Sequence, residues 1–177
     1  MLRKVIVVPH NPQWSREYLE EATKLAILFV EELLGIYHIG STAIPMIQAK
    51  PIIDILLEVR DLARIELYYP QMAESGYEAL GEFGLPGRRF FTRGGNLHRT
   101  HNIHIFQTGD PEIERCLNFR DYLIAHPAEA MIYSEMKRTL AQQFPADITS
   151  YVHGKDAFIK EVIRKAQAWR ENGQVEK

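Results

Sequence analysis

Asp54 is the first residue whose surroundings suggest chemistry, because it lies inside an apolar segment. Residues 51–59 are nearly continuously apolar apart from this carboxylate and Glu58. A carboxylate in such a segment is costly unless it is paired, hydrogen-bonded or bound to a metal. Two interpretations follow. Asp54 is part of a metal or catalytic site, or it forms a structural ion pair with Lys50 or an arginine.

The alternation of a strand places Asp54, Leu56 and Glu58 on one face of the sheet. At ~3.3 Å per residue, the two carboxylates lie about 13 Å apart. They therefore cannot share one metal ion without other ligands.

His104 is a second candidate, in the middle of the β-type run of residues 101–106. Alternation puts Asn102, His104 and Phe106 on one face and His101 on the other. Because the two histidines point to opposite faces, they do not form a paired ligand set. A histidine within a strand is a metal ligand, a general base or a satisfied core residue.

Gly40, Ser41 and Thr42 directly follow a predicted strand. Glycine lets the backbone approach a phosphate closely. The two hydroxyls and the neighbouring N–H groups can donate to phosphate oxygens. The alternative is a plain turn at the end of a strand. The spacing of a P-loop is absent.

Four arginines fall within a glycine-rich stretch, residues 76–100, and suit the binding of phosphate or carboxylate groups: Arg88, Arg89, Arg93 and Arg99. Lys50 and Arg120 are further cations for such a ligand. Phe90 and Phe91 could stack a base, but they fit a strand equally well. The alternative for the whole set is a solvated loop.

The elements that must position these residues alternate between helices and strands. The predicted helices span about 12–34, 61–74, 111–126, 127–144 and 155–171. The first is ended by Gly35, and the second is capped by Asp61 and interrupted by Pro70. The predicted strands are 36–39, 51–59, two short ones within 76–100, and 101–106. We expect an α/β (α+β) fold: a mixed β-sheet flanked by helices, with a C-terminal helical part, as a single domain over 1–177.

Composition narrows the class of protein. The chain has 177 residues and a net charge of −2, so no basic excess indicates nucleic acid. One cysteine excludes an internal disulfide and a Cys-rich zinc site. No stretch approaches the ~18 apolar residues of a membrane helix, and the first residues are too weakly apolar for a signal peptide. We therefore expect a cytoplasmic protein without a membrane partner.

Several spaced motifs together resemble the GrpB family. Residues 38–59, HIGSTAIPMIQAKPIIDILLEV, match its signature of Gly-Ser-Thr, Ala-Lys-Pro and an Asp between hydrophobic residues. The likeness continues in the order expected of the family through residues 100–105, 118–123, 126–127 and 151–159. It covers most of the chain.

The resemblance implies a nucleotidyltransferase-like fold, in which a Gly-Ser pair holds nucleotide phosphates and acidic residues hold two divalent metals, Mg²⁺ or Mn²⁺. Gly40 and Ser41 match that pair, and Asp54 matches the first carboxylate. The second carboxylate is replaced by Leu56. His104 is then the candidate for a further metal ligand or base.

Two functions follow from these residues. One is nucleotidyl or phosphoryl transfer to a small acceptor, with Asp54 and His104 as catalytic and metal-binding residues. Gly40, Ser41, Thr42, Lys50 and Arg120 would hold phosphates. The other is that of a binding module for a nucleotide or another anionic metabolite. Leu56 favours this second function. A similar domain is fused to dephospho-coenzyme A kinases, but this chain has no P-loop. A third interpretation is an interaction protein that uses its C-terminal helices.

Overall fold

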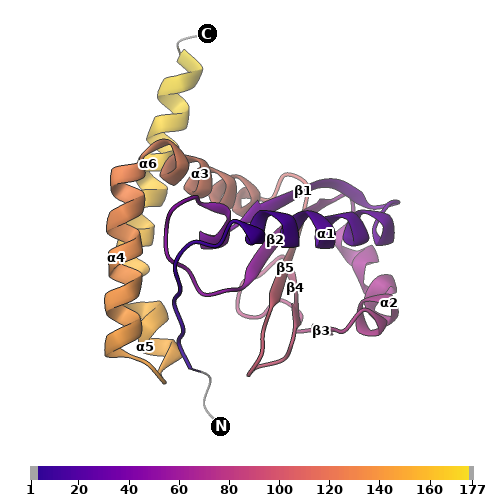
Figure 1. Cartoon of the computed structure of the whole chain (residues 1–177). Helices are drawn as coiled ribbons and strands as arrows, with labels where there is room; N and C mark the ends of the chain where they lie inside the picture. Colours follow the sequence, from indigo (N-terminus) through magenta and orange to yellow (C-terminus); the bar gives the residue numbers. More distant parts are fainter. Residues whose placement is uncertain (1–3, 176–177) are drawn as a thin grey trace. The chain divides into compact units, whose positions relative to one another are not determined.

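The computed structural model describes residues 4–175 and contains one mixed sheet (Figure 1). Its strands are β1 (Leu33–Ile39), β2 (Ile53–Val59), β3 (Tyr77–Ala79), β4 (Arg88–Arg93) and β5 (His101–Gln107). They are ordered β1-β2-β5-β4-β3. The pair β2 and β5 is parallel, and the other neighbours are antiparallel. This confirms the predicted mixed sheet.

The described helices and 3₁₀ segments are α1 (Gln13–Leu28), η1 (Ser41–Ala43), η2 (Leu62–Tyr68), α2 (Tyr69–Glu74), α3 (Pro111–Ala125), α4 (Pro127–Gln143), α5 (Ile148–His153) and α6 (Asp156–Val175). None of the helices within residues 4–175 is long and apolar enough to cross a membrane.

The chain divides into two compact units. The sheet unit comprises residues 12–39 and 52–113. The helical unit comprises, of the described residues, 4–11, 40–51 and 114–175. The expectation that residues 1–177 fold together as a single domain stays a prediction.

In the sheet unit, α1 covers one face of β1 and β2 and runs alongside β1 (Figure 1). Its apolar stripe buries Trp14, Ala22 and Leu25. β2 lies between β1 and β5, and its residues other than Asp54 and Glu58 are buried. An interior strand with both faces covered explains the nearly continuous apolar run in its sequence.

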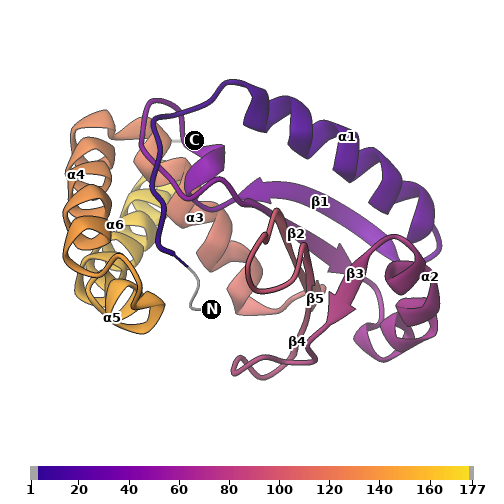
Figure 2. The same ribbon diagram turned by 60° about the horizontal axis from the view of Figure 1, so that its bottom comes forward.

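In the helical unit, α4, α5 and α6 lie side by side (Figure 2). Its core gathers residues of the 40–51 segment with residues of α3, α4 and α6: Ile44, Ile47, Tyr122, Leu123, Ala130, Tyr133, Val162 and Ala166. The predicted C-terminal helical part is therefore confirmed, and it includes α5 as a separate short helix.

The predicted end of the first helix was wrong. α1 ends at Leu28, and Gly35 lies inside β1, where the pairing with β2 shifts register between Leu33 and Gly35. Phe29 and Leu33 continue the spacing of a helical stripe, so periodicity extended the helix too far. The glycine marks an irregularity in a strand and does not stop the helix.

The predicted helix over 61–74 is split into η2 and α2. The Asp61 carboxylate accepts a hydrogen bond from the N–H of Ala63 at 2.9 Å, as expected of a cap. Pro70 lies in the first turn of α2, where its missing N–H costs little.

Candidate functional site

The parallel pairing of β2 and β5 brings Asp54 and His104 together. Asp54 lies opposite Asn102, and Leu56 lies opposite His104. The Asn102 amide Nδ2 donates to Asp54 Oδ1 at 2.7 Å, and His104 Nε2 lies 3.3 Å from the same oxygen. We call these three residues the Asp54 cluster. Asn102 was expected on the face of His104, but the sequence did not single it out as a site residue.

Arg88 holds the other side of the His104 ring. Its Nη1 lies 3.4 Å from His104 Nδ1, and its remaining donors bond the carbonyls of Glu82 and Phe83. A guanidinium can only donate, so Nδ1 accepts and the ring proton is on Nε2, facing Asp54. Arg88 thus fixes the histidine tautomer and ties the loop at residues 82–83 to it.

An aromatic stack extends from the Asp54 cluster to solvent. The ring of Phe90 lies 4.9 Å from that of His104, and Phe83 stacks on Phe90 at 5.2 Å. Phe83 is 58% exposed, whereas Phe90 and Phe91 are buried. The expectation that Phe90 or Phe91 could stack a base is therefore wrong, because strand alternation and packing enclose both rings. Phe83 is the exposed ring that stacks on Phe90.

Several buried polar atoms around the Asp54 cluster have no hydrogen-bond partner among the described residues. They are Asn102 Oδ1, Thr92 Oγ1 and Arg99 Nε. Thr92 lies directly opposite Asn102 in the sheet. Burial lowers the pKa of Arg99, and the charges of Glu78 and Asp54 partly offset that effect. Each unpartnered buried group costs about 1–3 kcal/mol, so such a group calls for an explanation.

Leu56 is fully buried at the position where the family resemblance places a second carboxylate. Within residues 4–175, no group of three or more histidine, cysteine and acidic side chains is placed to hold a metal ion. Two oxygen groups would fit a divalent cation, the Asp54 carboxylate and the unpartnered amide oxygen of Asn102, and His104 Nε2 would join them only after losing the proton that it directs toward Asp54. A site with so few protein ligands leaves coordination positions for ligand oxygens, as is usual for Mg²⁺.

The arginines of residues 76–100 do not form one set, contrary to the grouping made from the sequence. Arg88 lies on the face of the Asp54 cluster, because it shares that face with Phe90. Arg89 pairs with Glu66 at 3.0 Å, and Arg93 pairs with Glu21 at 2.8 Å. Alternation along β4 sends neighbouring arginines to opposite faces.

The opposite face, under α1, holds a buried charged network that the sequence did not reveal. Glu21 is 3% exposed and accepts hydrogen bonds from Tyr77, Arg93 and Lys24. Burial opposes its ionisation, but these partners outweigh burial and lower its pKa. His101 lies on this face, 2.9 Å from Arg93, and burial followed by the Arg93 charge lowers its pKa to about 4.

A cavity of about 410 Å³ borders this network and is lined by Glu21, Lys24, Tyr77, Arg93 and residues of α1. The polar groups that face it already bond one another. The α1 face therefore has the chemistry of a structural ion network. Two histidines three residues apart thus have different environments, as the alternation of β5 predicts.

Gly40 begins the turn that the sequence marked for phosphate binding, and it belongs to the helical unit. Its φ of 70° with ψ of −171° is a conformation essentially restricted to glycine. Its carbonyl accepts from the N–H of Ala43, and the Ser41 carbonyl accepts from Ile44. Thr42 is buried, so its side chain faces the protein interior, while Ser41 is half-buried. The phosphate role of this turn stays a prediction.

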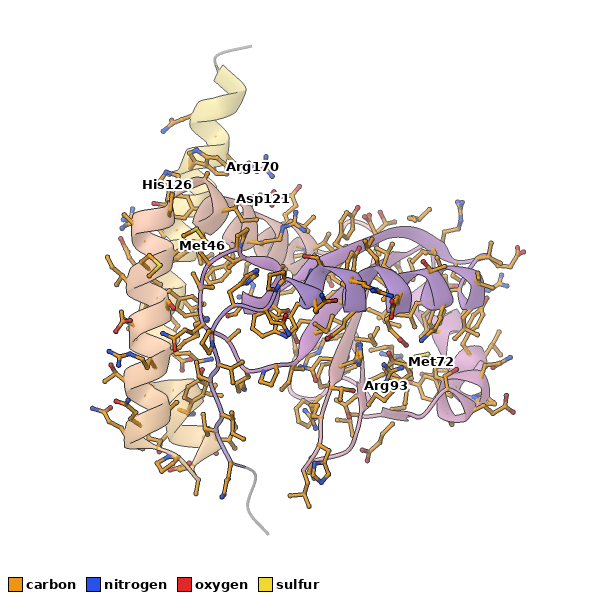
Figure 3. All side chains as sticks on the ribbon, in the orientation of Figure 1. Met46, Met72, Arg93, Asp121, His126 and Arg170 are labelled. Atoms are coloured by element: carbon orange, nitrogen blue, oxygen red, sulfur yellow. The ribbon has the colours of Figure 1, made fainter. Side chains whose placement is uncertain are left out.

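Lys50 and Arg120 also belong to the helical unit. Lys50 lies over the ring of Tyr151 at 5.3 Å. Arg120 bonds Asp121 at 2.8 Å, and Arg170 reaches the same carboxylate from α6 at 2.6 Å (Figure 3). Of the residues predicted from the sequence, Asp54 and His104 are thus joined by direct contact.

Residues 4–165 match the model of a family described as GrpB protein. The UPF0157 protein YqkA of Bacillus subtilis is 45% identical over 168 residues, which are 95% of this chain and 49% of that protein. The glutamate-rich protein GrpB of Alkalihalophilus pseudofirmus is 34% identical and is covered over 95% of its length. The crystal structure of GrpB from Enterococcus faecalis covers 93% of this chain and is itself covered over 99%, with 42% identity and a TM-score of 0.88.

This chain spans about half the length of YqkA and 47% of a dephospho-CoA kinase from Mycolicibacterium paratuberculosis, to which it is 27% identical. The Cid1 poly(U) polymerase structure aligns with 73% of this chain at 8% identity and a TM-score of 0.46, a likeness too low to carry an argument.

Proposed function

This chain belongs to the GrpB family, and we propose that it binds a nucleotide or another phosphorylated metabolite at the Asp54 cluster. The observation that carries the proposal is the set of unpartnered buried polar atoms, Asn102 Oδ1, Thr92 Oγ1 and Arg99 Nε, beside an Asp–His pair. A ligand with both acceptor oxygens and an associated cation would satisfy these donors and acceptors together.

The class of ligand follows from the surrounding side chains. Arg99 supplies a guanidinium donor for a phosphate oxygen. The Asp54 carboxylate and the Asn102 amide oxygen would hold one Mg²⁺ or Mn²⁺, with His104 Nε2 as a further ligand once its proton is displaced, and the cation would offset the charge of the phosphates. The exposed ring of Phe83 offers a surface on which a base can stack. Phosphates that carry a bound cation, together with a planar base, are what a nucleotide would bring to these side chains.

Binding is favoured over two-metal catalysis by Leu56. Two-metal transfer needs acidic ligands that offset the charge of two cations. The described sheet unit supplies Asp54 at this place, and a fully buried leucine occupies the second position. One cation with a bound nucleotide is the arrangement that these residues support.

Nucleotidyl or phosphoryl transfer to a small acceptor is the second candidate, and the Asp54–His104 contact favours it. The Asp54 carboxylate orients the His104 ring, and the Arg88 guanidinium occupies its other nitrogen. In this candidate, Arg88 would have to release Nδ1, which would then take the proton of the acceptor hydroxyl, and Asp54 would stabilise the charged ring that results.

A thermal-shift panel tests the binding proposal. The ligands are the four nucleoside triphosphates, coenzyme A and dephospho-coenzyme A, each with Mg²⁺, Mn²⁺ or EDTA. Ligand at ~100 times its Kd adds about 2.7 kcal/mol to the free energy of unfolding. We expect a metal-dependent rise in Tm with at least one ligand, and its loss in Asp54→Asn.

Glu58→Gln is the matched control, because Glu58 is the other carboxylate on the same strand and face and lies outside the cluster. We expect it to keep the ligand-dependent shift. The proposal would be wrong if no ligand of the panel raised Tm, or if Asp54→Asn folded and kept the full shift.

The variant Leu56→Asp asks whether the position beside Asp54 is a vestigial metal ligand. We expect a lower Tm, because a carboxylate replaces a fully buried side chain, and tighter Mn²⁺ binding in an electron paramagnetic resonance titration. Unchanged Mn²⁺ affinity in the folded variant would contradict the metal site.

A further inference from the structure

Lys137, in the middle of α4, is the most deeply buried cation of the described chain, with 2% of its surface exposed. Its ammonium donates to the backbone carbonyl of Gln48 and lies over the ring of Tyr133 at 4.5 Å. Neither contact supplies a counter-charge. A buried ammonium without a carboxylate partner is costly, so its retention calls for an explanation.

The segment that carries Gln48 is fixed against the same face of α4. The Gln48 N–H donates to Ser134 Oγ at 2.9 Å, while its carbonyl accepts from Lys137. Ser134 and Lys137 are three residues apart, so they share one face of the helix. This clamp holds the backbone two residues before Lys50.

Lys50 and Lys155 approach the same tyrosine. The Lys50 ammonium lies 5.3 Å from the centre of the Tyr151 ring, and the Lys155 ammonium lies 4.5 Å from it. Tyr151 is buried, and burial followed by the nearby Tyr133 raises its pKa, so its hydroxyl stays protonated as a donor. Both lysines are half-buried.

The neighbouring charges that act on Lys137 are positive, like the charge of Lys137 itself. Burial, then the charges of Lys155 and Lys50, lower its pKa to about 7. Tyr151 is neutral at that pH, because its pKa is raised. An anion placed among the three ammonium groups would remove this repulsion and restore the charged form of Lys137.

We propose that Lys50, Lys137 and Lys155 form an oxyanion site that takes the phosphate groups of a polyphosphate or phosphorylated ligand. We call it the lysine cluster. All of its members lie in the helical unit. The inference shares Lys50 with the predicted phosphate-binding set but does not depend on the proposed nucleotide binding at Asp54. Lys137 was not singled out from the sequence, and Lys155 was noted only as part of the family motif at residues 151–159.

Isothermal titration of the full chain with tripolyphosphate in EDTA tests the lysine cluster without a metal or a base. We expect Lys137→Met and Lys155→Met each to weaken binding about tenfold or more, since each removes one charge-assisted contact. Lys160→Met is the matched control: Lys160 is exposed on α6, five residues beyond Lys155. We expect it to keep the affinity.

Proton uptake gives a second, independent readout. Titrations at about pH 8 in buffers of different ionisation enthalpy should show protons taken up on binding, because Lys137 is largely neutral there before the anion arrives. The uptake should vanish in Lys137→Met. Methionine matches the lysine in length, and the variant removes a buried charge that has no carboxylate partner together with the donor to the Gln48 carbonyl. If that variant fails to fold, the half-buried Lys155→Met decides the affinity test.

The outcomes separate this inference from the proposed function. Tripolyphosphate binding that survives Asp54→Asn and fails in the lysine variants supports the lysine cluster, whatever the nucleotide panel shows. Absence of tripolyphosphate binding in the wild type overturns it. So does an equal loss in Lys160→Met, which would indicate adventitious attraction of an anion to surface charge.

Discussion

The two faces of the sheet each carry a histidine and a carboxylate, but the surroundings of these groups differ. On the face under α1, Glu21 is bonded by Tyr77, Arg93 and Lys24, and His101 lies against Arg93. The charges in this network are paired within the sheet unit. This face behaves as a polar core.

On the other face, Asp54 has Asn102 and His104 as neighbours, yet Asn102 Oδ1 and Thr92 Oγ1 have no partner among the described residues. Burial alone therefore does not separate a structural network from a candidate site, since both faces hold buried polar groups. The completeness of their hydrogen bonding separates them.

The largest expected effect is on the α1 face. Replacing Arg93 by methionine leaves the buried Glu21 carboxylate without its guanidinium partner, and we expect a loss of about 3 kcal/mol in the free energy of unfolding. Urea denaturation measures it. Arg89→Met is the control: its partner Glu66 is exposed, and the loss should be about 0–1 kcal/mol. If Arg93→Met lost no more free energy of unfolding than the control, the buried network under α1 would not differ from a surface ion pair.

The next largest effect is on the pH dependence of stability, and it arises from His101. Its pKa is lowered from 6.5 to about 4 in the folded protein, so the unfolded chain binds this proton first as the pH falls. Stability should therefore decrease between about pH 6.5 and pH 4, by up to about 3 kcal/mol, and this group adds no further loss below that range.

Urea denaturation of His101→Gln across this pH range should show a shallower dependence than the wild type. The control His153→Gln replaces an exposed histidine of α5 and should leave the slope unchanged. If both variants follow the wild-type curve, His101 is not the neutral buried group that the structure indicates.

The smallest effect contrasts one hydroxyl from each face. Thr92→Val removes a buried hydroxyl without a partner, so we expect unchanged stability or a gain of about 1 kcal/mol. Tyr77→Phe removes a donor to the Glu21 carboxylate and should cost about 1.5–3 kcal/mol. Thermal or urea unfolding compares the two. A clear loss in Thr92→Val would mean that its hydroxyl has a partner in the native protein.

The local pattern of apolar and polar residues predicted much of the structure of the sheet unit. The apolar run of β2 indicated an interior strand, and alternation along β5 placed Asn102 and His104 on one face and His101 on the other. The Asp54–His104 contact also needed the pairing of β2 with β5. That contact joins residues 50 positions apart, and no local spacing encodes it.

Other features lay outside the reach of local pattern. The stripe through Phe29 and Leu33 fits a helix and the start of a strand equally well, so the end of α1 was misplaced. Glu21 stands in α1 among other acidic residues, Glu17 and Glu20, and no local pattern marks it as buried. Its burial depends on Tyr77 and Arg93, which lie more than 50 residues away.

The sequence by itself determined the family, the mixed sheet, the C-terminal helices and the opposite orientation of the two histidines. These follow from motifs and from the periods of helix and strand, which are local properties. The tertiary structure alone decided which charged groups are buried and what they contact: Glu21 with Arg93, Asp54 with Asn102 and His104, and Lys137 with the Gln48 carbonyl and the Tyr133 ring. Burial and electrostatic partners depend on packing between distant segments, and that packing exists only in the folded chain.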